Sequence, residues 1–152
     1  MPRTRIAATA AVTAAAAAAT LFMFPGQAQA AGSVHLTKIW YNSPGSDSRS
    51  NTSLNGEWVQ IKNTTTKSVS LKGWTLTDAS KHAYTFGTFT LKAGKTVTVK
   101  TGKGTNTATT VFQKRGAYVW NNDKDTATLR RASKAVQDTC AYNAPKSSSK
   151  AC

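Results

Sequence analysis

Acidic residues are scarce in this chain of 152 residues. The chain has 6 Asp and Glu residues compared with 20 Lys and Arg residues, and Glu57 is the only glutamate. Histidine occurs twice, and neither His35 nor His82 has a cysteine or a second histidine at zinc-ligand spacing. No Gly-x-Ser-x-Gly nucleophile motif is present. We therefore expect a protein with no catalytic residues, no cofactor, no metal site and no small-molecule substrate.

One acidic cluster leaves a second interpretation open. Asp123 and Asp125, together with Asn121 and Asn122, offer the oxygen ligands that hard cations prefer. No glycine or bidentate glutamate follows at the spacing of a calcium loop. The sequence therefore favours side chains that cap a β-turn over a calcium site.

Long apolar runs are confined to the N-terminus. Arg3 and Arg5 precede an alanine-rich run over 6–24, and Ala28–Ala30 has the small-x-small pattern of a signal peptidase site. A membrane anchor is the alternative, although alanine drives insertion only weakly. We expect residues 1–30 to be a secretory signal peptide. The mature chain would then be secreted or envelope-associated, with no membrane span.

Cysteine is limited to Cys140 and Cys152. In an exported protein such a pair predicts a disulfide. The loop that it closes is short, so the chain-entropy contribution would be about 3 kcal/mol. Two free thiols, or an intermolecular bond through Cys152, remain alternatives.

No segment after residue 30 shows a helical period, and apolar residues instead alternate with polar ones. The clearest case lies in Gly56–Asp78, where Val59 and Ile61 face away from Trp58 and Lys62. Strands separated by turns about every ten residues predict an all-β sandwich. The strands expected are 34–41, 57–63, 69–76 with a break at Gly73, 82–86, 96–101, 126–131 and 136–142. Shorter apolar pieces at 89–91, 111–112 and 118–120 add to the core.

Three connecting segments complete the predicted organisation. The polar stretch Asn42–Asn55 should be an exposed, mobile loop. The glycine-bearing segment Gly102–Thr107 should be a hairpin loop rather than part of a phosphate loop, because no helix follows it. The Ser/Lys/Pro-rich tail over 143–152 should be loose up to Cys152.

Several separated motifs resemble the lamin tail domain family. They are Glu57–Asn63, Leu71–Leu76, Tyr84–Phe86, Phe89–Gly94, Trp120 and Thr126–Leu129. Secreted bacterial members are similar in their Trp-Asn-Asn-Asp turn, although they usually carry glycine where this chain has Lys124. The resemblance implies an immunoglobulin-like β-sandwich over 31–142. It does not imply filament formation, because the chain has no heptad rod, and we expect a monomer.

The charge directs the functional hypothesis. Without Arg3 and Arg5, the chain has 18 basic and 6 acidic residues, which gives a formal charge of +12. This positive charge attracts anionic partners. We hypothesise a binding module for an anionic polymer, either nucleic acid or cell-wall polysaccharide. The candidate residues are Trp58, Lys62, Lys72, Lys100 and Arg130.

Two alternatives remain. The charge is incidental if the protein is an extracellular structural or protein-interaction module. Trp58 contributes nothing to binding if it packs under a neighbouring loop instead of stacking on a ligand.

Overall fold

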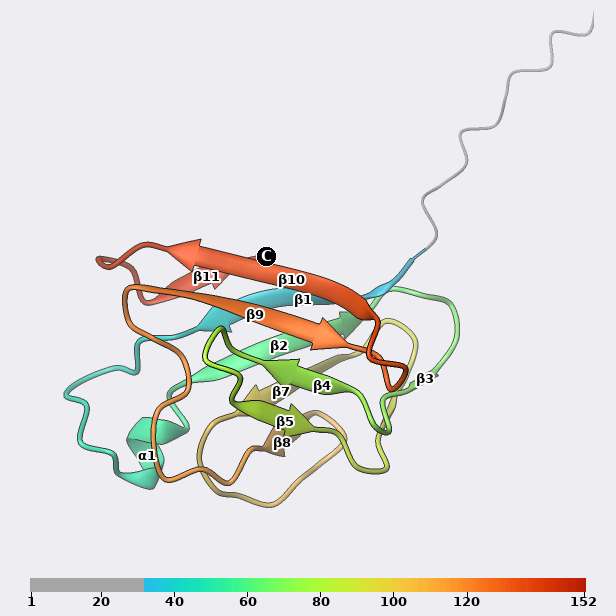
Figure 1. Cartoon of the computed structure of the whole chain (residues 1–152). Helices are drawn as coiled ribbons and strands as arrows, with labels where there is room; N and C mark the ends of the chain where they lie inside the picture. The colour runs from blue at the N-terminus through green and yellow to red at the C-terminus, as the bar shows by residue number, and fades with distance from the viewer. Residues whose placement is uncertain (1–31) are drawn as a thin grey trace, which may run out of the picture.

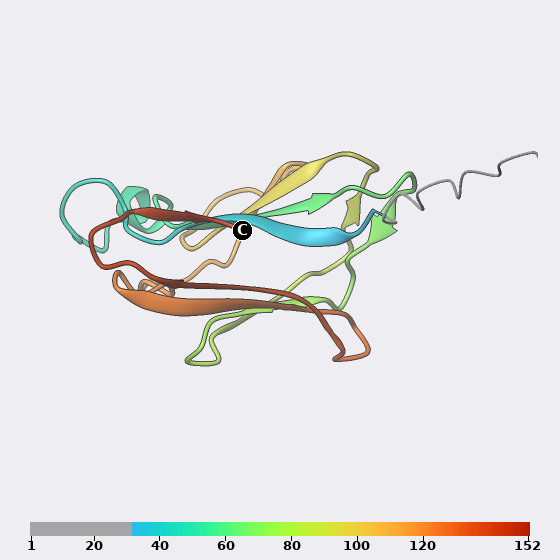
Figure 2. The ribbon, with the colours of Figure 1, turned by 90° about the horizontal axis from the view of Figure 1, so that it is seen from above.

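Two β-sheets packed face to face form the protein, as a computed structural model describing residues 32–152 shows (Figures 1 and 2). This confirms the all-β sandwich. The predicted signal peptide, residues 1–30, lies outside the described residues. No helix within 32–152 is long and apolar enough to cross a membrane.

The strands divide between two main sheets and one small one. The five-stranded sheet has the order β11 (Ser149–Ala151), β1 (Val34–Trp40), β2 (Trp58–Asn63), β7 (Thr96–Lys100) and β8 (Thr110–Phe112). The four-stranded sheet has the order β10 (Val136–Asn143), β9 (Lys124–Arg130), β4 (Thr75–Thr77) and β5 (Ala83–Thr85). A two-stranded sheet pairs β3 (Val69–Ser70) with β6 (Thr90–Leu91).

The core lies between the two main sheets, where alternate side chains meet. Val59 and Ile61 on β2 are fully buried, and Leu76 on β4 and Leu129 on β9 meet them from the opposite layer. Trp74 is buried at the edge of this cluster. The period of two therefore predicted the core side of the central strands correctly.

The predicted mobile loop before β2 contains the short helix α1 (Asn51–Leu54), capped by the Ser50 side chain. Leu54 is buried, and so is Ser43, whose hydroxyl donates to the Ser53 carbonyl oxygen at 2.6 Å. The expectation of a wholly exposed loop is therefore wrong. A single helical turn is too short to produce a recognisable period in the sequence.

The connection between β7 and β8 also differs from the prediction. The two strands run parallel, with Val99 opposite Val111, so the segment over 102–107 is not a hairpin loop. The Thr98 amide donates to the Thr109 carbonyl oxygen at 2.8 Å, which ties the returning chain to β7. Alternation of side chains indicates a strand but not its direction, so the sequence pattern left this connection undetermined.

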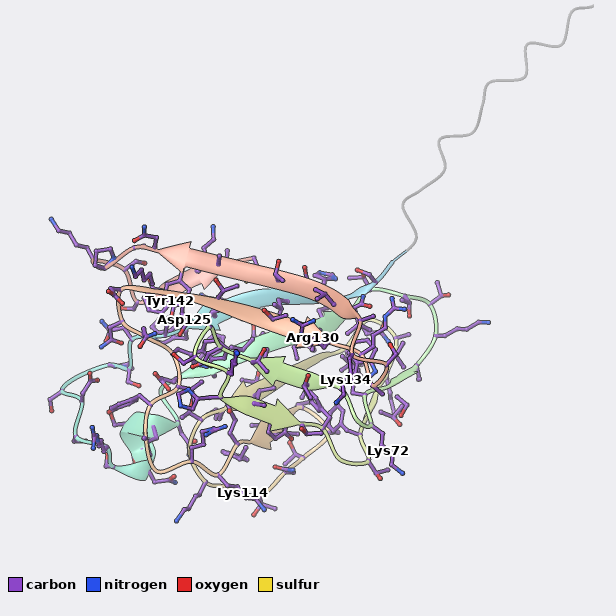
Figure 3. All side chains as sticks on the ribbon, viewed as in Figure 1. Lys72, Lys114, Asp125, Arg130, Lys134 and Tyr142 are labelled. Atoms are coloured by element: carbon purple, nitrogen blue, oxygen red, sulfur yellow. A yellow bond between two sulfur atoms is a disulfide. The ribbon has the colours of Figure 1, made fainter. Side chains whose placement is uncertain are left out.

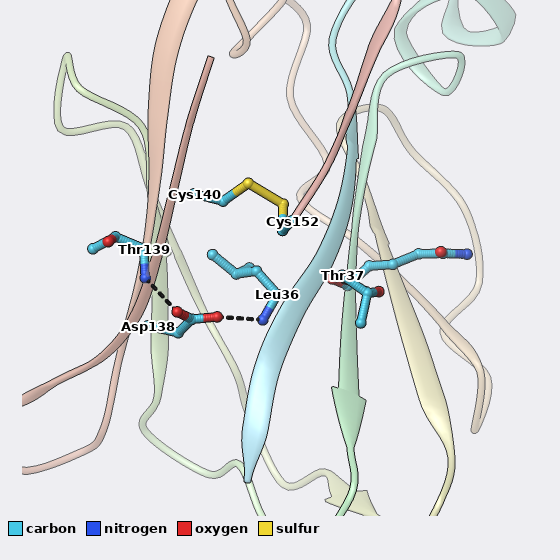
Figure 4. Close-up of a disulfide and its surroundings, with 7 residues drawn as sticks. Leu36, Thr37, Asp138, Thr139, Cys140 and Cys152 are labelled. Atoms are coloured by element: carbon cyan, nitrogen blue, oxygen red, sulfur yellow. Dashed lines mark hydrogen bonds between the residues drawn. A yellow bond between two sulfur atoms is a disulfide. The ribbon is translucent and has the colours of Figure 1, made fainter.

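The end of the chain is not loose, because Ser149–Ala151 form β11 against β1. A disulfide joins Cys140 on β10 to Cys152, with Cα atoms 5.7 Å apart (Figure 4). The Cys152 amide donates to the Thr37 carbonyl oxygen at 2.9 Å. The predicted intramolecular bond is confirmed, and it links the two sheets rather than only fixing a tail to the last strand.

A second tie between the sheets lies beside the disulfide. The Leu36 amide on β1 donates to Asp138 Oδ2 on β10 at 2.8 Å (Figure 4). Leu36 adjoins a register shift in the pairing of β1 with β2, between Leu36 and Lys38. Asp138 therefore binds a backbone group of β1 next to its β-bulge.

The only glutamate of the chain is almost completely buried, just before β2. Glu57 Oε2 accepts from the Thr101 hydroxyl at 2.9 Å and from the Val119 amide at 3.1 Å, whereas Oε1 has no partner. Burial raises the pKa of this carboxyl from 4.5 to about 7. Glu57 thus connects the start of β2, the end of β7 and the segment before β9.

Loss of the disulfide should destabilise the sandwich. Cys152→Ala removes the cross-link at an exposed residue, so we expect the free energy of unfolding to fall by about 3 kcal/mol. Denaturant unfolding under non-reducing conditions measures this loss. Lys150→Ala, on the same short strand, should change stability far less. Equal midpoints for wild type and Cys152→Ala would contradict the prediction.

Glu57 should make stability depend on pH. The folded state holds the proton more tightly than the unfolded state, so its contribution is complete below pH 4.5 and is lost as pH rises to about 7. The lost contribution amounts to about 3 kcal/mol. Unfolding free energies measured across this range should show the slope in wild type.

The matched variants are Glu57→Gln, which cannot titrate, and Asp123→Asn, which removes an exposed carboxylate that has no part in the raised pKa of Glu57. Glu57→Gln should flatten the slope between pH 4.5 and 7, and Asp123→Asn should preserve it. A slope that persists unchanged in Glu57→Gln would show that another group causes it.

Candidate ligand face on the five-stranded sheet

A row of large side chains crosses the outer surface of the five-stranded sheet. Cross-strand pairing places Trp40 opposite Trp58, Trp58 opposite Lys100, and Lys100 opposite Phe112. Directly opposed residues have Cβ atoms about 5 Å apart and share one face. We call Trp40, Trp58, Lys100 and Phe112 the aromatic row.

The two tryptophans form the centre of this row. Their rings stack with centroids 5.7 Å apart at an interplanar angle of 26°, and both side chains are partly exposed. Trp40 Nε1 donates to the Asn42 carbonyl oxygen at 2.9 Å, which fixes one ring. Phe112 contributes less surface, because the Gly104 backbone lies against its ring. The exposed platform is therefore the Trp40–Trp58 pair.

Lysines surround the platform. Lys38 Nζ lies 5.1 Å from the Trp40 ring centroid and 5.9 Å from that of Trp58, within cation–π range. Lys100 neighbours Trp58 across the strands, and Lys62 lies further along β2, opposite His35. Within residues 32–152 the one salt bridge is His82–Asp78, so none of these lysines is neutralised by a carboxylate. The face is positive.

A polar pocket of about 650 Å³ lies beside Lys100 of this row. Serine, threonine and asparagine side chains from 46–55 line it together with Lys100, and we call it the serine pocket. Asn51 Oδ1 accepts from the Lys103 amide at 2.7 Å, and both Asn51 and Asn55 donate to the Lys103 carbonyl oxygen. These bonds hold the segment around α1 against the loop after β7.

The five predicted site residues do not form one patch. Trp58, Lys62 and Lys100 share the outer face of the five-stranded sheet, whereas Arg130 lies on β9 in the other sheet (Figure 3). Lys72 lies in the turn after β3, which contacts the β9–β10 hairpin: a Cβ on Gly73 would lie 3.2 Å from Cβ of Ala132. Lys72 and Arg130 therefore belong to a second basic region.

The second basic region surrounds the β9–β10 hairpin. An Arg130 guanidinium nitrogen donates to the Lys134 carbonyl oxygen at 3.3 Å, and Lys134 and Lys72 lie toward the same end of the sheet (Figure 3). No tryptophan stack accompanies these cations among the aromatic pairs of the described residues. This region therefore lacks the platform of the opposite sheet.

Hydrogen bonds to Asp125 stabilise the acidic turn at the start of β9. Asp125 is buried, its Oδ1 accepts from the amides of Ala79 and Thr126, and its Oδ2 accepts from Asn121. The Tyr142 hydroxyl donates to the Asn121 carbonyl oxygen at 2.6 Å, and burial raises the pKa of Tyr142. These contacts confirm the turn-capping interpretation. No group of three metal-binding side chains occurs in residues 32–152.

The histidines also have structural surroundings. His82 Nδ1 lies 2.6 Å from Asp78 Oδ2, and the His82 amide donates to Asp78 Oδ1 at 2.6 Å. Both contacts close the turn between β4 and β5. His35 contacts only Ser33 through its ring nitrogen. The histidine–carboxylate pair thus stabilises the turn over 78–82.

Sequence reasoning missed Trp40 and Lys38 as parts of the face. In a regular strand every second residue lies on the same face. Because Val34 and Leu36 face the core, that alternation would also place Lys38 and Trp40 in the core. The register shift between Leu36 and Lys38 reverses the phase, so that Ile39 is buried and Trp40 is partly exposed. The only available signal was the cross-strand partner Trp58, which the sequence alone does not assign.

Comparison with known sequences agrees with the architecture. No match to this chain is found among curated proteins. The sequence model of the lamin tail domain family matches residues 27–144, which contain every strand from β1 to β10. The chain therefore belongs to the lamin tail domain family.

Proposed function

We propose that this chain is a secreted, monomeric and non-catalytic bacterial module that binds an anionic polymer, nucleic acid or cell-envelope polysaccharide. The outer face of the five-stranded sheet is the binding surface. One observation carries the proposal, namely the partly exposed Trp40–Trp58 stack with Lys38 beside it. Lys62 and Lys100 extend the positive charge along the same face.

An extended polymer suits this surface for two reasons. Flat aromatic rings bind rings of successive monomers without requiring a deep cavity, and neighbouring lysines attract regularly spaced anionic groups. The formal charge of +12 that remains without Arg3 and Arg5 raises the local concentration of such polymers around the protein. Lys72 and Arg130 add long-range attraction but lie away from the stacked rings.

A protein partner is the second candidate. Val136, at the β9–β10 hairpin, is 52% exposed and is the one exposed large hydrophobic residue of the described chain. Val136 opens β10, an edge strand of the four-stranded sheet, and an edge strand suits the docking of a protein segment. A single stoichiometric partner that is recovered from culture supernatant and survives high salt would favour this function over polymer binding.

Polymer binding should weaken steeply with salt. With three lysine contacts, affinity for single-stranded oligothymidylate should fall about 20-fold between 50 and 200 mM salt. Lys62→Ala and Lys100→Ala should each weaken binding several-fold at low salt. Fluorescence anisotropy of labelled oligothymidylate and of labelled polygalacturonate measures both effects.

Lys72→Ala is the matched control, because it removes the same charge from the second basic region, away from the stacked tryptophans. It should weaken binding clearly less than Lys62→Ala or Lys100→Ala. Absence of binding to both polymers at low salt, or an affinity that does not respond to salt, would exclude the proposed function. Equal losses in all three lysine variants would exclude a specific face.

A further inference from the structure

The serine pocket lies beside the platform and has a different chemistry. Its walls carry hydroxyl and amide groups, and Lys100 is its cationic side chain. Its volume of about 650 Å³ lies within the range of pockets that hold small ligands. Lys100 is also the direct cross-strand neighbour of Trp58, so this one side chain borders both the pocket and the platform.

Some of the pocket hydroxyls are available for a ligand. Ser48, Ser50 and Ser53 bond within the loop, and the Ser53 hydroxyl also contacts the Tyr118 hydroxyl at 2.6 Å. Among residues 32–152, the side chains of Ser46 and Thr52 make no hydrogen bond, and both are exposed. The hydrogen bonds within the loop therefore hold the wall of the serine pocket in place. The hydroxyls of Ser46 and Thr52 remain free to bind a ligand.

We propose that the bound polymer is an acidic polysaccharide with a carboxylate on its sugar rings. A sugar ring would stack on the Trp40–Trp58 platform and a neighbouring ring would enter the serine pocket. This inference rests on the proposed function and names the ligand class of the same face. The pocket hydroxyls pair with sugar hydroxyls, and Lys100 pairs with the carboxylate.

Three features favour a sugar chain over nucleic acid. The indole face, which carries partial negative charge, attracts the C–H groups of a sugar ring. Neutral hydroxyl and amide groups predominate in the pocket, and they complement a ligand rich in hydroxyls. A nucleic-acid groove instead needs many cations along the backbone path, whereas Arg130, Lys134 and Lys72 lie around the β9–β10 hairpin.

The test compares three defined ligands by calorimetry at one low salt concentration. They are an oligogalacturonide, its methyl ester, and single-stranded oligothymidylate. The oligogalacturonide should bind at least about tenfold more tightly than oligothymidylate, and esterification should weaken binding about tenfold by removing the charge that pairs with Lys100. Trp58→Ala should weaken oligogalacturonide binding about tenfold.

The pocket is tested by the double variant Ser46→Ala/Thr52→Ala. It should weaken oligogalacturonide binding about tenfold, since two hydrogen bonds are lost, and change oligothymidylate binding less than about twofold. Thr128→Ala, on the outer face of the other sheet, is the matched control and should have no effect on either ligand. Thermal unfolding verifies that both variants remain folded.

The outcomes separate the two proposals. Tighter binding of oligothymidylate, or a double variant that behaves like Thr128→Ala, would overturn the polysaccharide inference while leaving polymer binding by the face intact. If neither charged ligand binds at low salt, the proposed function fails and the inference fails with it.

Discussion

The pairing of β1 with β2 is the contact on which both the core and the ligand face depend. Its register places Ile39 beside Val59 on the inner side and Trp40 beside Trp58 on the outer side. A slip of one residue would exchange the two faces of a strand. The same pairing therefore fills the core and assembles the tryptophan stack.

The bulge in β1 makes this arrangement possible. It shifts the phase of the strand after Leu36, and Asp138 on β10 binds the Leu36 amide at that point. The disulfide from Cys140 to Cys152 lies close by and secures β11 along the opposite edge of β1. β1 is thus held from three directions, by β2, β10 and β11, which limits its freedom to change register.

Charge is distributed more widely than the candidate site. The cations lie in at least two regions, and only the one on the five-stranded sheet combines lysines with stacked tryptophans. Net charge accounts for attraction at a distance, whereas short-range complementarity depends on which side chains share a face. The serine pocket adds a neutral, hydroxyl-rich surface to that face.

The sequence by itself predicted most of the strands, the inward side of Val59, Ile61 and Leu76, and a disulfide between the two cysteines. Each of these follows from local alternation or from a count of residues. The tertiary structure decided the parallel course of β8, the outward position of Trp40 and the separation of Arg130 from Lys100. Those features arise from strand direction, a bulge and sheet order, which depend on contacts between distant segments and leave no periodic trace in the chain.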